Sequence, residues 1–206
     1  MAAIIFDFDG TIADTFHYVS DFLAGSAGIA SLTDKDRQKL RALSMLAMAR
    51  QLGHPWWKLP NLFFKGRLRM GEAIEHIQPF TGMPEVIHKL HAEGHELFIL
   101  SSNNVHNVRT FLKRHGLRTY FLEIYGGVGL FGKAPALRRL IKEHQLDLRA
   151  CLYIGDELRD VEAAQSLKLR VIAVSWGFAK LSDLQDARPT KLATEPAELL
   201  ALIEDL

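Results

Sequence analysis

The chain has a single cysteine, no excess of charge of either sign and no long apolar segment. Because Cys151 is alone among 206 residues, an internal disulfide framework is excluded, which is typical of proteins from a reducing compartment. The 25 basic and 24 acidic side chains give a net charge of +1, so the sequence offers no electrostatic reason to bind nucleic acid or anionic lipid. No apolar segment approaches the ~20 residues that cross a bilayer, and we expect no membrane association.

We expect no leader, and the sequence shows no internal repeats or low-complexity tracts. Met1 runs directly into an apolar segment without a basic region or a cleavage site, which predicts a cytoplasmic protein. Apolar residues make up 48% and charged residues 24% of the chain, the balance of an ordinary globular protein. An enzyme or a binding protein fits this composition. The oligomeric state, monomer or homodimer, stays open.

Short β-rich runs alternate with helical patterns over most of the chain. Four runs end in small or polar residues and predict strands at 3–10, 95–103, 150–157 and 169–177. Patterns of helical period predict helices at 84–94, 107–116, 134–146 and 158–169, and the closing EPAELLALIEDL predicts another that covers the sheet. Near-continuous apolar runs are typical of strands buried on both faces. The alternation predicts an α/β fold with a doubly wound, Rossmann-like parallel sheet.

Residues 15–79 break this alternation. The segment predicts only helices, at 16–27, 34–52 and 63–77, separated by glycines and prolines. A helical block inserted directly after the first strand is most simply a separate cap. We therefore predict an α/β core formed by residues 1–14 and 80–206, and an all-helical cap domain formed by residues 15–79.

Chemically capable side chains follow the predicted strands. In open parallel sheets, ligands bind beyond the carboxyl ends of the strands. The residues that the sequence brings to this rim come from four separate stretches: Asp7 and Asp9; Ser101, Ser102 and Asn103; Lys133, which precedes a helix; and Asp156 and Asp160.

Carboxylates gathered at one rim repel each other unless a cation compensates them. Hard oxygen ligands in small number suit Mg²⁺, which also accepts a substrate phosphate. One carboxylate could then attack phosphorus, and a second carboxylic acid could protonate the leaving oxygen. Lys133 could supply positive charge to the transferring phosphoryl group, and Ser101 a hydrogen bond.

The motifs resemble those of the haloacid dehalogenase (HAD) superfamily, in particular the phosphoglycolate phosphatase-like branch with a helical cap. The DxDGT motif is met by DFDGT at 7–11, and the GDxxxD motif by GDELRD at 155–160. The serine after an apolar strand is met by FILSSN, and the lysine before a proline-containing helix start by GKAPAL. The resemblance implies a phosphatase that acts on a small phosphate monoester.

The resemblance also implies roles for single residues. Asp7 is expected to be the nucleophile and Asp9 the general acid and base. The phosphate group would contact Gly10, Ser101, Ser102, Asn103 and Lys133. Mg²⁺ would be held by Asp7, the Asp9 carbonyl and Asp156, with Asp160 binding it directly or through a neighbour. The branch often carries Thr-Asn where this chain has Ser-Ser-Asn, so the choice between Ser101 and Ser102 stays open.

Other activities on this fold have separate signatures. A dehalogenase needs no acid for its departing halide, so Asp9 favours phosphoryl transfer. A sugar-phosphate mutase and a non-catalytic phosphate-binding protein remain as alternatives. In the cap, Trp56, Trp57 and the basic side chains of Lys58, Lys65, Arg67 and Arg69 could surround an anionic or aromatic leaving group. Tryptophans between prolines are, however, more typical of a packed helix junction, and alternating basic residues of a solvated helix face.

Overall fold

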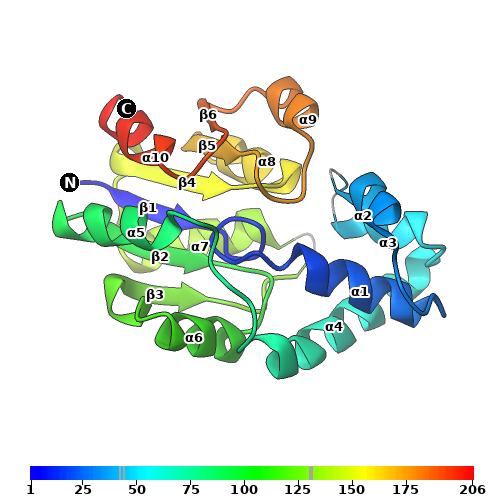
Figure 1. Cartoon of the computed structure of the whole chain (residues 1–206). Coiled ribbons are helices and arrows are strands. Elements are labelled where there is room, and N and C mark those ends of the chain that lie inside the picture. The colour runs from blue at the N-terminus through cyan, green and yellow to red at the C-terminus, as the bar shows by residue number, and fades with distance from the viewer. Residues whose placement is uncertain (42, 44, 130–131) are drawn as a thin grey trace.

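A parallel sheet forms the centre of the molecule (Figure 1). The computed structural model describes residues 1–41, 43, 45–129 and 132–206. Within these ranges the sheet has six strands in the order β3-β2-β1-β4-β5-β6. The strands are β1 (Ala3–Phe6), β2 (Glu96–Leu100), β3 (Phe121–Tyr125), β4 (Cys151–Gly155), β5 (Arg170–Val174) and β6 (Lys191–Ala193). The predicted α/β fold with a doubly wound parallel sheet is confirmed.

The first strand lies at the middle of the sheet. β1 pairs in parallel with β2 on one side, where Ile4 is opposite Leu97, and with β4 on the other, where Ile4 is opposite Leu152. Ile5 and Phe6 are fully buried, as expected of a strand covered on both faces. The sequence missed β3 and β6: β3 carries the exposed Leu122, and β6 has only three residues.

Helices cover both faces of the sheet. One face is covered by α5 (Met83–Ala92), α6 (Val105–Arg114) and α10 (Glu198–Glu204), and the other by α7 (Lys133–Glu143), α8 (Leu158–Ser166) and α9 (Leu181–Asp186). The apolar side chains form two clusters: Ile4 belongs to the first and Ile5 to the second, because successive side chains of a strand point to opposite faces. The shorter 3₁₀ helices are η1 (Trp56–Lys58), η2 (Arg118–Tyr120) and η3 (Leu148–Ala150).

Four helices lie beyond the carboxyl ends of the strands (Figure 1). They are α1 (Phe16–Ser26), α2 (Asp34–Leu40), α3 (Met45–Gln51) and α4 (Leu59–Ala73). The two ends of this inserted segment are side by side: the Asp14 N–H donates to the Gln78 carbonyl and the Phe80 N–H to the Ile12 carbonyl, both at 3.0 Å. The division into core and cap at 14/15 and 79/80 stays a prediction. Among the described residues, no helix has the length and apolar character needed to cross a bilayer.

Three expectations for the inserted segment are corrected. The single helix predicted at 34–52 is wrong: α2 ends before Arg41, whose ψ of 136° is not helical, and α3 begins at Met45. Residues 42 and 44 of that prediction lie outside the described residues. The helix predicted at 63–77 begins earlier, at Leu59, with Pro60 in its first turn, a position where the missing N–H costs nothing. Trp56 and Trp57 are 70% and 64% exposed, so they do not fill a helix junction.

Phe8 anchors the segment that follows β1. Its ring meets the Phe111 ring of α6 edge to face, with centroids 5.0 Å apart, and both side chains are fully buried. Replacing Phe111 by alanine should lower the free energy of unfolding by about 3–5 kcal/mol, because it removes a large buried ring and leaves a cavity. Urea denaturation measures this change. Leu122→Ala, at an exposed position, is the control and should cost about 1 kcal/mol or less; equal losses for the two variants would contradict the packing described.

Candidate active site

Three carboxylates from two neighbouring strands and one helix converge at the carboxyl end of the sheet. Asp7 follows β1, Asp156 follows β4, and Asp160 lies in the first turn of α8. Each offers an oxygen, and the three oxygens lie within 4.8 Å of one another. The side chains are no more than 2% exposed. The structure therefore brings together three of the residues that the sequence predicts at the rim.

Hydrogen bonds fix the orientation of these carboxylates. The Phe8 N–H donates to Asp7 Oδ1 at 2.8 Å. Asp156 accepts from the Thr11 hydroxyl and from the Phe178 N–H, both at 2.8 Å. Because the unused lone pairs of these oxygens are buried, the group is preorganised to bind a cation or a donor.

Gly10 lets the chain turn tightly beside Asp156. Its φ of +81° is a conformation that side chains disfavour, and a Cβ there would lie 2.2 Å from Asp156 Oδ2. Gly10 therefore shapes the turn that follows Asp9. The predicted contact of Gly10 with phosphate stays a prediction.

Lys133 is the cation of this cluster. It is the first residue of α7, 3% exposed, and its Nζ lies 2.5 Å from Asp7 Oδ2 and also donates to Asp160. Asp160 accepts in addition from the Tyr153 hydroxyl at 3.2 Å and from the Glu157 N–H at 3.0 Å. Lys133 therefore contacts two of the carboxylates, as expected from the sequence.

The charges of the cluster do not cancel, because one lysine faces three buried carboxylates. Burial, with repulsion from Asp160, raises the pKa of Asp7 to about 7, although Lys133 opposes the shift. Burial and the charges of Asp7 and neighbouring acids hold the pKa of Asp156 well above its usual range. The raised pKa of Lys133, despite its burial, reflects the carboxylates of Asp160 and Asp7. An all-oxygen, electron-rich and partly uncompensated site of this kind fits a divalent cation such as Mg²⁺.

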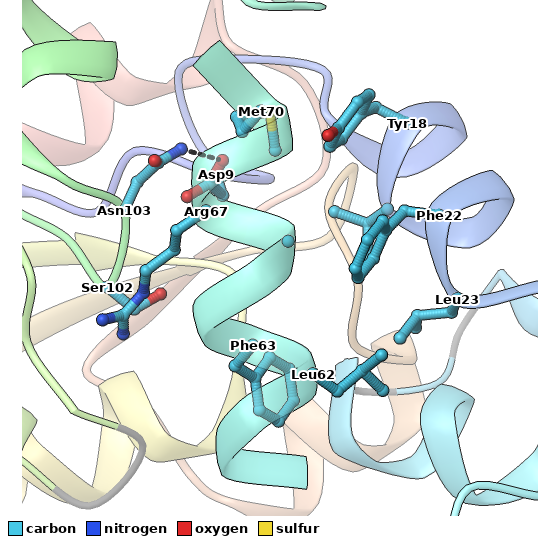
Figure 2. Close-up of a pocket in the computed structure, with 12 residues that line it drawn as sticks. Asp9, Tyr18, Phe22, Leu23, Leu62, Phe63, Arg67, Met70, Ser102 and Asn103 are labelled. Carbon is cyan, nitrogen blue, oxygen red and sulfur yellow. Dashed lines mark hydrogen bonds between the residues drawn. The ribbon is translucent and has the colours of Figure 1, made fainter. Parts of the chain in front are cut away.

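The Asp9 side chain is not part of this cluster but faces the inserted helices. Asn103 Nδ2 donates to Asp9 Oδ1 at 3.2 Å (Figure 2). Both residues line a cavity of about 50 Å³ together with Ser102 and with Arg67 of α4. Burial raises the pKa of Asp9 to about 6, with the Asn103 hydrogen bond opposing the shift. Asp9 can therefore hold or release a proton near neutral pH, and the role of its carbonyl as a metal ligand stays a prediction.

Ser101 and Ser102 occupy different environments at the end of β2. The Ser101 hydroxyl is buried and accepts from the Asn103 N–H at 2.9 Å, which leaves its own O–H free to donate. Ser102 is half-buried and lines the cavity beside Asp9. The contact of either serine with phosphate stays a prediction, and the choice between them stays open.

The structure adds residues that sequence reasoning did not assign. Thr11 orients Asp156, a role that its place in DFDGT could have indicated. Of the basic residues of the inserted segment named above, only Arg67 lines the cavity with Asp9. Its Nη2 donates to the Val128 carbonyl at 2.8 Å. Arg159 pairs with Glu157 beside the cluster. The contacts of Thr11 and Arg67 join residues 145 and 61 positions apart. Of these two residues, only Thr11 stands in a motif that could have indicated its role.

Without a divalent cation, the site should make the fold less stable as pH rises. The folded-state pKa values of Asp7 (about 7) and Asp9 (about 6) lie above the ordinary 3.8, so their protonated forms favour folding. That stabilisation is complete below about pH 4 and is lost as pH rises to about 7. The free energy of unfolding, measured by urea denaturation in a chelator, should fall between pH 5 and pH 8 by a few kcal/mol in all, and Mg²⁺ should reduce the fall. Asp7→Asn should flatten the profile, and a metal-free protein that gains stability over this range would contradict the assignment.

The chain is similar to known proteins in sequence and in structure. A family model described as haloacid dehalogenase-like hydrolase matches residues 4–174. A phosphoglycolate phosphatase of Synechococcus elongatus is 34% identical over 209 residues, which cover 100% of this chain and 99% of the relative. A 5'-nucleotidase of Pseudomonas aeruginosa is 24% identical, with 98% and 95% of the two chains covered.

Solved structures share the fold over nearly the whole chain. A predicted phosphatase of Clostridium acetobutylicum has a TM-score of 0.82 at 20% identity, with 100% and 99% of the chains covered. A haloacid dehalogenase-like hydrolase of Streptococcus pneumoniae has a TM-score of 0.80 at 22% identity, with 98% of each chain covered. With the sequence match and the carboxylate site, these similarities show that the chain belongs to the haloacid dehalogenase-like hydrolases, in the phosphoglycolate phosphatase-like branch of phosphatases.

Proposed function

We propose that this phosphatase is Mg²⁺-dependent and hydrolyses a small, anionic phosphate monoester, such as phosphoglycolate, through a phosphorylated Asp7. The observation that supports it best is the convergence of Asp7, Asp156 and Asp160 within 4.8 Å, with Lys133 on Asp7. Mg²⁺ at this cluster would neutralise the carboxylates and polarise the phosphate. A cytoplasmic location and a cap formed by residues 15–79 belong to the same proposal.

Asp7 has the position and the surroundings of a nucleophile. One of its oxygens accepts the Phe8 N–H, and the other faces Lys133. In the first step a carboxylate oxygen of Asp7 would attack phosphorus, and the bond from phosphorus to the ester oxygen would break. Lys133, with donors at the end of β2, would stabilise the charge on the transferring group. Water would then attack the phosphorus of the aspartyl phosphate and release inorganic phosphate.

Asp9 is suited to move the proton in both steps. It lies two residues from Asp7, and burial keeps its pKa near 6, so it can be protonated when substrate binds. It would donate its proton to the departing ester oxygen and afterwards accept one from the attacking water.

Arg67 supports an anionic leaving group. Arg67 is half-buried and lines the cavity together with Asp9 and Ser102. Burial lowers the pKa of Arg67, and the charge of Asp9 only partly opposes this shift. A carboxylate on the substrate would therefore give the Arg67 guanidinium an additional counter-ion. The phosphoglycolate phosphatases among the relatives agree with a carboxylate-bearing ester.

Asp7→Asn tests the nucleophile. The amide fills the same space but cannot attack phosphorus, so turnover should fall at least about 10³-fold while the circular dichroism spectrum stays unchanged. A screen of metabolite phosphoesters, with and without Mg²⁺, measures released phosphate for both proteins. Retained turnover in the variant would refute the role of Asp7, and isomerised sugar phosphate in place of free phosphate would indicate a mutase.

Arg67→Met tests the anionic leaving group. The variant keeps an apolar stem but loses the charge, so KM for phosphoglycolate should rise about tenfold or more, the usual effect of losing a hydrogen bond to a charged group. KM for ethyl phosphate, which has no carboxylate, should change less than threefold. Arg69→Met, at the exposed neighbouring position, is the matched control. A similar rise for both esters would exclude recognition of the carboxylate by Arg67.

A further inference from the structure

The cap helix α4 contacts the core over the side chain of Asn107. Asn107 lies in the first turn of α6 and is only 1% exposed. Its Nδ2 donates to the Arg67 carbonyl of α4 at 2.9 Å and to Asn103 Oδ1 at 3.0 Å. The helices approach closely because Gly71 has no side chain: a Cβ there would lie 3.3 Å from Asn107 Oδ1. The amide of Asn107 thus joins the cap to a residue of the active site.

The orientation of Asn103 depends on this contact. Its Oδ1 accepts from the Asn104 backbone N–H at 2.9 Å and from Asn107 Nδ2 at 3.0 Å. Because a backbone N–H can only donate, this end of the amide must be the oxygen. The nitrogen end therefore faces Asp9 and donates to its Oδ1 at 3.2 Å (Figure 2).

This hydrogen bond distinguishes the two oxygens of Asp9. Oδ1 accepts from Asn103, which favours Oδ2 as the oxygen that carries the hydrogen of a protonated Asp9. Asp9 lies beneath α4, whose Arg67 and Met70 side chains are drawn beside it in Figure 2. An unbroken series of hydrogen bonds therefore runs from the α4 backbone through Asn107 and Asn103 to Asp9.

We propose that Asn107 is a positioning residue that couples the seating of α4 on the core to the orientation of Asp9 as an acid. The inference rests on the proposed function, in which Asp9 protonates the leaving oxygen. With α4 seated, Asn107 holds Asn103 and Asn103 holds Asp9. Without the Arg67 carbonyl as acceptor, the Asn107 amide is free to turn. Asn103 Oδ1 then keeps only one of its two hydrogen-bond donors, the Asn104 N–H. Proton donation is thus efficient only when the cap covers the site and excludes water.

The test uses two esters that differ in their need for an acid. p-Nitrophenolate leaves as a stable anion, whereas the oxygen of an alkyl phosphate must be protonated as it leaves. We compare kcat/KM, which reports the steps up to departure of the leaving group, for p-nitrophenyl phosphate and for the alkyl ester that the screen identifies. Asn107→Ala and the nearly isosteric Asn107→Asp, which cannot donate, should lower the alkyl value about tenfold to hundredfold. The aryl value should change less than threefold.

Asn104→Asp is the matched control. The aspartate keeps the acceptor that caps α6 through the Asn107 N–H at 2.7 Å but loses the contact of Asn104 Nδ2 with the Arg67 carbonyl at 3.5 Å. This variant keeps both hydrogen bonds to Asn103 Oδ1, from the Asn104 N–H and from Asn107 Nδ2. The ratio of kcat/KM for the alkyl ester to kcat/KM for the aryl ester should therefore equal that of the parent protein.

A double variant separates the series of hydrogen bonds from a general packing effect. If Asn107 acts through Asn103, the double variant Asn103→Ala/Asn107→Ala should have the same kcat/KM for the alkyl ester as Asn103→Ala alone. Equal losses on both esters in a folded Asn107 variant, or additive losses in the double variant, would overturn the role of Asn107. Failure of the parent protein to release phosphate from any ester would instead refute the proposed function.

Discussion

The active site depends on the burial of three carboxylates around one lysine. Removing charged groups from water is costly, and the cost is offset here by hydrogen bonds from backbone N–H groups and by Lys133. The compensation is incomplete, as the raised pKa values of Asp7 and Asp156 show. A site that leaves negative charge uncompensated is suited to a divalent cation, and the fold supplies the stability that holds it together.

The sheet order is what brings these carboxylates together. β1 and β4 are neighbours, and the Asp7 N–H donates to the Ile154 carbonyl at 2.8 Å, so that the chain leaves both strands side by side. β1 and β4 are buried along their whole length. β1 cannot slip by one residue without moving Ile4 and Ile5 to the wrong clusters. The fixed register of β1 and β4 therefore fixes the position of Asp7 relative to Asp156.

The inserted helices divide the site into two environments. On the side of the sheet, Lys133 and the three carboxylates form a buried cluster of charged side chains. On the side of the inserted helices, the cavity is lined mostly by apolar side chains such as Phe22, Leu62 and Phe63, and Arg67 is the cation among its lining residues. Asp9 and Asn103 lie at the boundary between the two, which is where the bond to the leaving group would break. A segment that enters and leaves at one point, through Asp14 and Phe80, can cover this boundary without disturbing the sheet.

Local patterns in the sequence were sufficient for the α/β fold and for the gathering of Asp7, Asp156, Asp160 and Lys133, because buried parallel strands and motif spacing leave local signals. They were insufficient for β3 and β6, whose exposed or short segments lack the apolar signal, and for the break between α2 and α3. Only the tertiary structure turned the Asp9 side chain away from the carboxylate cluster and placed Arg67 and Asn107 against the core. Those positions are set by the packing of a helix against residues up to 61 positions away along the chain, and no local pattern of amino acids records a contact of that kind.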